Sequence, residues 1–249
     1  MLPSICKLNG IFHWIVLAAV ALVASTLAGV TGFGGAAVLL PALVAFFGVR
    51  QAIPILTVAQ LIGNGSRVWF HRRNLHWDVV GWFALGAVPM ALLGGYVFAT
   101  APLTALTRAL GAFLLLVVVW RHLHPRNPRK FPVQVFAGIG AGASFLSALL
   151  GSVGPIMAPF FLAYGLAKSA YIGTEALSTV VMHVTKLVAY HQTAVLTRFG
   201  IVVGLGLGPV MILGSFLGKR IVDRLPERVF VIIIEVVLVA AGLLFLIRG

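Results

Sequence analysis

Two sets of polar side chains recur at helical spacing inside otherwise apolar stretches of the sequence. Residues three and four apart share one face of a helix, so each set forms a stripe along one face. Amide, hydroxyl, guanidinium and ammonium groups can bind an anion, whereas carboxyl and imidazole groups can exchange protons. The stripes predict two faces of a cavity; the alternative is that they satisfy one another in a packed bundle. They are Thr57, Gln60, Asn64 and Arg67 in the first half of the chain, and Glu175, Thr179, His183 and Lys186 in the second.

A glycine-rich break precedes each stripe. The first reads G-F-G-G-A-A-V-L-L-P over residues 32–41, and the second reads G-S-V-G-P-I-M-A-P over residues 151–159. A helix that begins directly after such glycines presents unbonded backbone N–H groups and a positive dipole end, which suit an anion. The alternative is close packing of helices through small residues. The residues predicted to bind an anion at the breaks are Gly32, Gly34, Gly35, Pro41, Gly151, Ser152, Gly154 and Pro155.

Two basic residues, Arg50 and Lys168, follow the breaks at matching positions, where a hairpin would turn. If the hairpins re-enter the membrane, both cations lie deep in the protein and can attract an anion. The alternative is an interfacial position with only the side-chain stem in lipid. The predicted binding set is completed by hydroxyl residues beside Glu175 and by the amide and cationic side chains of the first stripe. These are Thr174 and Ser178, together with Gln60, Asn64 and Arg67.

The acidic residues are few enough to single out a proton carrier. Of five Asp and Glu residues, Glu175 and Glu235 lie in apolar stretches, and only Glu175 has polar neighbours in its stretch. His183 follows eight residues later, about 12 Å along a helix, a gap that a water or substrate can bridge. Lys186, one turn further, would repel a proton on the imidazole. We predict that Glu175, His183 and Lys186 couple proton movement to the anion.

The composition predicts an all-α polytopic membrane protein. The 249 residues are 61% hydrophobic and 9% charged, which leaves too little polar surface to coat a soluble globule. We therefore expect a single membrane domain over residues 1–249. Apolar stretches of about 20 residues can cross a ~30 Å core, but those at 36–47 and 156–164 are too short and are predicted to be half-helices or re-entrant pieces. The stretches are 11–30, 36–47, 52–70, 79–99, 103–120, 133–150, 156–164, 171–190, 201–217 and 229–247, which gives about 8 to 10 transmembrane or re-entrant segments.

The second half of the chain repeats the first. P-M-A-L-L-G at 89–94 is answered by P-V-M-I-L-G at 209–214, in addition to the matching breaks. The repeats cover about residues 11–122 and 131–248, joined by a linker at about 121–132. An odd number of crossings in each half inverts one half relative to the other, so we predict two inverted-topology repeats. A parallel pair would need one crossing that is far too long for the bilayer.

The net charge of +13 follows the pattern of a membrane protein. Basic residues gather at the ends of apolar stretches, near residues 72–73, 121–130 and 219–228. This positive-inside pattern predicts a cytoplasmic linker, a location in the cell's inner membrane and contact with anionic lipids. Nucleic-acid binding is excluded, because no basic helix face interleaved with aromatic residues lies outside the apolar stretches. The first stretch could also be a signal peptide, but it is longer than such a region and runs into a motif that recurs without one.

Other classes of function find no support in the sequence. The single cysteine, Cys6, and the scattered histidines give no metal-ligand spacing, so we expect no metal and no cofactor. The glycine strings lack the strand and the later acidic residue of a dinucleotide-binding fingerprint. No Walker sequence, hydrolytic carboxylate pair or Ser/His/Asp arrangement is present, so the sequence predicts neither an enzyme nor an ATP-driven pump.

The two breaks carry a resemblance to a known family. G-F-G-G-A-A-V-L-L-P-A-L at 32–43, and G-S-V-G-P-I-M-A-P-F-F-L at 151–162 with A-K-S-A-Y-I-G-T at 167–174, resemble the sulfite exporter TauE/SafE family, also called the toluene sulfonate uptake permeases. The resemblance covers nearly the whole chain, with Ser152 and Val153 departing from the usual glycines. It implies a permease for sulfite, sulfonates or related small organic anions, driven by the proton gradient.

We therefore predict a secondary transporter that works by alternating access, with one repeat rocking against the other. Two alternatives stay open: a non-transporting membrane protein that anchors or assembles a partner, and an anion channel. The stripes favour transport over assembly, because an assembly factor has little use for ionisable side chains inside the bilayer.

Overall fold

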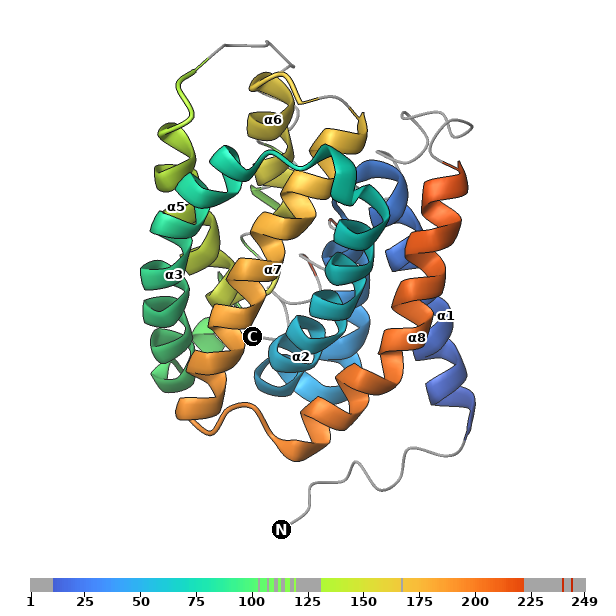
Figure 1. Cartoon of the computed structure of the whole chain (residues 1–249). Helices are drawn as coiled ribbons and strands as arrows, with labels where there is room; N and C mark the ends of the chain where they lie inside the picture. Colours follow the sequence, from blue (N-terminus) through green and yellow to red (C-terminus); the bar gives the residue numbers. More distant parts are fainter. Residues whose placement is uncertain are drawn as a thin grey trace.

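The protein is a bundle of helices (Figure 1). The computed structural model describes residues 11–102, 104–106, 108–109, 112, 115–116, 119, 131–166, 168–221, 239 and 243. These residues form helices and no strand, which confirms the all-α prediction. Most of the predicted linker, half of stretch 103–120 and nearly all of stretch 229–247, including Glu235, lie outside the described residues. The elements are α1 (Ile11–Thr31), α2 (Gly35–His71), the 3-10 helix η2 (Arg72–Asn74), α3 (Trp77–Thr100), α5 (Val135–Leu150), α6 (Gly154–Ala163), α7 (Lys168–Gln192) and α8 (Arg198–Ile221).

The lengths and outer surfaces of the helices confirm a multi-pass membrane protein. Of the described helices, α1, α2, α3 and α8 are each long and apolar enough to cross a membrane. Helix α7, with 25 residues, is about 37 Å long, but its polar stripe interrupts its apolar character. Large apolar side chains point outward, as at Leu85 and Val202, which are 65% and 68% exposed. A soluble protein would rarely leave so much apolar surface in water, whereas lipid accepts it.

In both halves, glycines at corresponding positions end the first helix and form the turn of the hairpin that follows. Helices α1 and α5 both end at a glycine with positive φ, Gly32 at +79° and Gly151 at +81°. The following hairpins turn at Gly48, with φ +72°, and at Gly165, with φ +95°. Only glycine adopts these left-handed conformations without strain. Gly48 breaks α2 into a short arm (35–47) and a long arm (49–71), which correspond to α6 and α7 in the second half.

Helices from the two halves exchange packing partners. Helix α3 packs along α5, and α8 packs along α1, while α2 and α7 cross in the centre. The exchanged contacts are close because they involve glycines: a Cβ added to Gly94 would lie 2.8 Å from the carbonyl oxygen of Phe145, and one on Gly29 would lie 2.9 Å from that of Ser215. Each half therefore gives its third long helix to the first helix of the other half.

Corresponding helices run in opposite directions. In Figure 1, α1, the long arm of α2 and α8 rise, whereas α5, α7 and α3 descend. Hydrogen bonds agree with this view: Lys219 near the end of α8 donates to the carbonyl of Phe70 near the end of α2. Tyr96 near the end of α3 donates to Gln192 at the end of α7. These directions are those that an inverted repeat requires.

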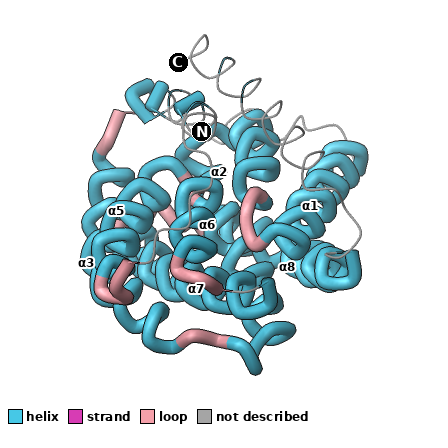
Figure 2. The backbone as a smooth tube through the Cα atoms, turned by 90° about the horizontal axis from the view of Figure 1, so that it is seen from above, coloured by secondary structure: helices cyan, strands magenta, loops and turns pink. Residues whose placement is uncertain are grey.

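Two separate hydrophobic cores result from this exchange. The first lies mainly among α1, α2 and α8, and the second among α3, α5, α6 and α7. We call these helix groups the first and second bundles. Seen from above, α3 and α5 lie on one side of the molecule and α1 and α8 on the other (Figure 2). The long arm of α2 and helix α7 bring the two polar stripes to the seam between the bundles.

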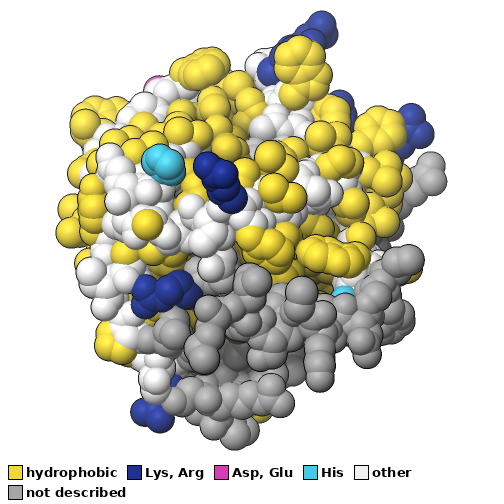
Figure 3. Space-filling model, turned by 90° about the horizontal axis from the view of Figure 1, so that it is seen from below, with side chains coloured by type: hydrophobic (Ala, Val, Ile, Leu, Met, Phe, Trp, Pro, Cys, Tyr) yellow, Lys and Arg dark blue, Asp and Glu magenta, His cyan; other side chains and the backbone are white. Residues whose placement is uncertain are grey.

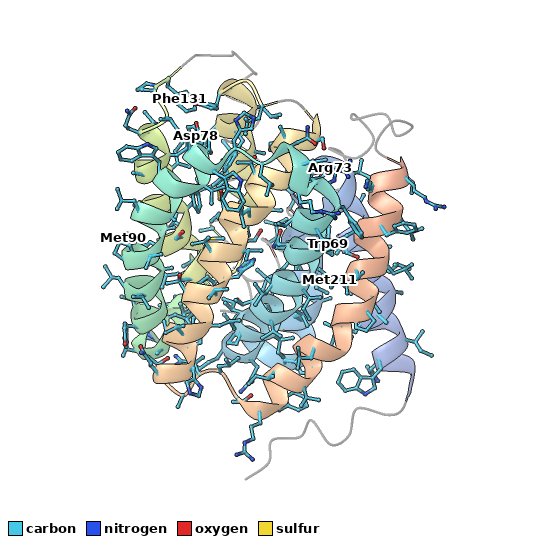
Figure 4. All side chains as sticks on the ribbon, in the orientation of Figure 1. Trp69, Arg73, Asp78, Met90, Phe131 and Met211 are labelled. Carbon is cyan, nitrogen blue, oxygen red and sulfur yellow. The ribbon has the colours of Figure 1, made fainter. Side chains whose placement is uncertain are left out.

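Exposed charged side chains lie toward the ends of the bundle. Basic residues gather where α2 and α8 end, including Arg72, Arg73, Lys219 and Arg220, and Figure 4 shows Trp69 and Arg73 at that end. Arg72 stacks on the ring of Trp69 at 4.2 Å. From the opposite end, hydrophobic side chains cover much of the described face and acidic ones are hardly seen (Figure 3). Basic and aromatic residues at a helix end are typical of a membrane interface.

Candidate functional site

The two glycine-rich breaks meet in the centre of the protein. A Cβ added to Gly154, the first residue of α6, would lie 3.1 Å from the Cβ of Phe33 and 3.7 Å from the backbone nitrogen of Gly34. The amide of Val38 donates the first hydrogen bond of α2, to the carbonyl of Gly34. The N–H groups of Gly35 and Ala36 precede this bond and have no acceptor within the helix. Two positive helix ends therefore face each other across the breaks.

A buried cavity of about 40 Å³ lies at this meeting point. By the usual space for one water molecule, it has room for about three waters. Residues of both polar stripes contribute to its wall, together with most of the break residues. The lining comprises Gln60, Asn64 and Arg67 from α2, Glu175, Thr179 and His183 from α7, the break residues Gly32, Phe33, Gly34, Gly35, Ala36, Gly151, Ser152, Val153 and Gly154, and Ala28, Ser147, Met157 and Met182.

Arg67 is fixed against the first break. Its Nη1 donates to the carbonyl oxygens of Gly32 at 2.7 Å and Ala28 at 3.2 Å, and its Nη2 donates to the side-chain oxygen of Asn64. Ala28 lies in the last turn of α1, and its carbonyl also accepts a hydrogen bond from the backbone N–H of Gly32, the residue that follows the helix. The guanidinium is 95% buried and is therefore a rigidly held positive charge at the cavity wall.

Glu175 faces Arg67 across the seam between the bundles. Its Oε2 lies 3.9 Å from Arg67 Nη1, and its Oε1 accepts a hydrogen bond of 3.1 Å from Thr179. Both side chains of the ion pair are almost fully buried. A separation of 3.9 Å is longer than a charge-assisted hydrogen bond, so the two groups are within ion-pair distance but are not hydrogen-bonded to each other. The two charges belong to different bundles, and the cavity lies beside them.

Several polar atoms of the cavity wall lack a hydrogen-bond partner. They are Gln60 Nε2, Arg67 Nε, Glu175 Oε2 and His183 Nδ1, each buried. Buried polar groups are nearly always hydrogen-bonded in proteins, so a group of such atoms around one cavity indicates a polar ligand. Gln60 and Arg67 supply donors, Glu175 supplies an acceptor, and His183 supplies either one according to its protonation.

Lys186 stands behind the cavity. Its ammonium is fully buried and donates to the hydroxyl of Ser147 at 3.1 Å. Ser147 lines the cavity, so it links the lysine to the site. In the part of the chain that the structure describes, no carboxylate lies within ion-pair distance of Lys186. The site therefore has a further ionisable group beside the Arg67 and Glu175 pair.

Other predicted residues lie away from the cavity. Arg50 donates from Nη1 and Nη2 to the carbonyl oxygens of Ala99 and Ala101, at 2.5 and 2.6 Å, and so caps the C-terminal end of α3. Thr174 accepts a bond from the backbone N–H of His76, before α3 begins. Neither residue lines the cavity, and the same is true of Pro41, Thr57 and Ser178. The side chains of Pro155 and Lys168 lie outside the described residues.

The sequence did not single out seven residues of the wall, which are Ala28, Ala36, Val153 and the four described next. Phe33 lies within the first break, while Ser147, Met157 and Met182 come from α5, α6 and α7. Ser147 carried a weak signal, because Ser144 and Ser147 are one turn apart in an apolar stretch. Apolar side chains such as Met157 carry no such signal. In the described residues, no group of His, Cys, Asp or Glu is placed to hold a metal ion.

The fold and the site define a polytopic membrane protein with a small polar cavity buried at the crossing of two broken helices. The model of the sulfite exporter TauE/SafE family matches residues 17–245, and the chain belongs to that family. The family is one of membrane transporters for sulfite and related sulfur anions. Neither curated proteins nor solved structures gave a match.

Proposed function

We propose that this protein is a secondary transporter that moves a small anion, such as sulfite, a sulfonate or a related organic anion, across the cytoplasmic membrane. One observation carries the proposal: two helix N-termini and several unpartnered buried polar atoms converge on one cavity. Broken helices whose positive ends face a midplane site are typical of transporters. We propose no enzymatic activity.

The anion would sit between the first bundle and the break of the second. Its oxygens would accept hydrogen bonds from Arg67 Nε, Gln60 Nε2 and the amide groups of Gly35 and Gly154. Arg67 keeps its other nitrogens on α1 and Asn64, so the nitrogen that remains is already oriented. Such pre-organisation reduces the entropy lost on binding. Lys186 adds positive charge through Ser147.

Competition for Arg67 would couple the anion to a proton. Among the described residues, Glu175 is the carboxylate within ion-pair distance of Arg67, and a bound anion would meet the same positive charge. Protonation of Glu175 removes its negative charge, and therefore favours the anion beside Arg67. Thr179, His183 and Lys186 follow on the same face of α7, and His183 would pass the proton on. The anion and the proton would then cross in the same direction.

Alternating access would move the two bundles against each other. Each bundle has its own hydrophobic core, and the cavity and the Arg67 to Glu175 pair lie at the seam. The moving units would therefore not be the two sequence halves, since α3 packs with the second half and α8 with the first. The opposed directions of corresponding helices support an inverted-topology repeat, in which the two access states are related by symmetry.

The orientation in the inner membrane follows from the charges. We propose that the end of the bundle with Arg72, Arg73, Lys219 and Arg220 faces the cytoplasm, where it contacts anionic headgroups. The other end, where α8 begins at Arg198, would face outward.

Uptake into liposomes tests the proposal. Purified protein is reconstituted, and entry of labelled sulfite, taurine and acetate is followed with and without an imposed pH gradient. Saturable uptake of an anion that accumulates with the proton gradient is expected. Flux that does not saturate and never exceeds equilibrium would indicate a channel. A protein that carries none of these anions would instead favour an anchoring or assembly role.

A further inference from the structure

A second cavity, which opens to the outside beside the exposed residues Val135 and Leu146, adjoins the anion site. It has a volume of about 420 Å³ and is lined by apolar residues of α5 and α6, among them Ile139, Leu146 and Phe160. This is about the size of a site for a small organic molecule. No charged or amide side chain contributes to its lining, in contrast to the cavity at the breaks.

Two side chains belong to both linings. Met157 and Val153 line the small polar cavity on one side and the large apolar cavity on the other. Both are almost fully buried, at 1% and 3% exposure, within the second hydrophobic core. Val153 precedes α6 and Met157 lies in its first turn, so the wall belongs to the same broken segment that presents the helix end to the anion.

We infer that Met157, together with Val153, is a specificity-determining wall that narrows the proposed range of substrates to compact anions such as sulfite and excludes sulfonates with a bulky organic tail. The inference rests on the proposed anion site. The polar cavity has room for about three waters, so it suits a compact anion such as sulfite better than a larger one. A sulfonate has a similar oxygen head, but its tail would need the space that Met157 fills. The apolar cavity beyond would accept that tail if the wall were shortened.

Met211 provides a matched control. It is a methionine of the same burial, at 1% exposure, but it lies on α8 in the first core and lines neither cavity (Figure 4). Truncating it loosens a core to the same extent without opening the wall. Met157→Leu is a second control, because a volume-conserving change keeps the wall.

Competition for labelled sulfite on the purified protein tests the inference, with unlabelled sulfite and benzenesulfonate as competitors. The wild type and Met211→Ala should bind sulfite and exclude benzenesulfonate, and Met157→Leu should likewise show no gain in benzenesulfonate binding. Met157→Ala should bind benzenesulfonate at least about tenfold more tightly than the wild type does, a typical gain when apolar groups gain a pocket. Met157→Val, a smaller truncation, should show the same gain to a lesser degree and replaces the alanine variant if that one does not fold.

Three outcomes would overturn the inference. The wild type could bind benzenesulfonate as tightly as sulfite, neither truncated variant could bind benzenesulfonate more tightly than the wild type, or Met211→Ala could show the same increase in affinity as Met157→Ala. Each of these leaves sulfite binding in place, and so spares the proposed function. If the wild type does not bind sulfite, that result would contradict the proposed anion site itself, and therefore also the specificity wall.

Discussion

Replacing Arg67 with methionine should destabilise the protein, and replacing Glu175 as well should cost clearly less than the two single losses added together. Arg67 donates to two carbonyls of α1 and to Asn64, and faces Glu175 at 3.9 Å. At that distance two opposite charges attract by about 4 kcal/mol at an effective dielectric constant of about 20. Breaking a buried ion pair by removing one partner typically costs about 3 to 5 kcal/mol, because the other charge stays buried alone.

A double-mutant cycle separates the ion pair from the other bonds of Arg67. Arg67→Met should lower the free energy of unfolding by about 3 to 5 kcal/mol, and Glu175→Gln by a similar amount. The double variant should lose clearly less than the sum, with a coupling energy of about 2 kcal/mol or more. Reversible unfolding in mixed detergent micelles measures all four proteins. Arg72→Met is the control, since Arg72 is exposed beside Trp69 and should change stability by less than about 1 kcal/mol.

The result that refutes this reasoning is an additive cycle. If the two single losses sum to the double loss within about 0.5 kcal/mol, the charges do not stabilise each other. Glu175 would then not compete for Arg67, and the proposed coupling of proton to anion would lose its structural basis.

Three further predictions concern binding, coupling and topology. Gly154→Ala places a methyl group 3.1 Å from Phe33 Cβ and should weaken anion binding about tenfold, whereas Gly65→Ala, with open space around it, should bind as the wild type in the same equilibrium assay. Glu175→Gln should still exchange labelled anion across liposomes but no longer accumulate it with a pH gradient; accumulation at the wild-type level would make Glu175 structural. Single cysteines in place of Arg126 and Arg198, in a cysteine-free background, should differ in intact cells: only the second should react with an impermeant reagent, and equal labelling would contradict the inverted topology.

Much of the site could be predicted from the sequence because helical spacing is a local property. The stripes containing Arg67 and Glu175 do face one cavity, and the breaks at Gly34 and Gly154 do meet. In each case the signal was an ionisable side chain or a run of glycines in an otherwise apolar segment. Both features cost free energy inside a bilayer. Such features are rarely kept in a membrane span unless they face a pathway or one another.

The rest depended on neighbours that are distant in the chain. Arg50 and Lys168 matched in the alignment of the halves, yet Arg50 caps α3 because Ala99 and Ala101 lie beside it in space. The role of the wall residue Met157 could not be predicted from the sequence either. It is one apolar side chain among many, and its spacing gives no indication of the cavities that it lines. The exchange of α3 and α8 between the halves likewise needs three-dimensional contacts to be seen.

That exchange bears on how the protein is made. As the chain is inserted from its N-terminus, α1 and α3 enter the membrane before their partners α8 and α5 have been synthesised. The glycine-containing faces of these helices, at Gly29 and Gly94, must contact lipid or an insertion factor until the helices of the second half have been inserted. The first half alone therefore lacks the packing partners of two of its helices. The first hydrophobic core, to which α1 contributes, is completed only when α8, the last long described helix, has been inserted.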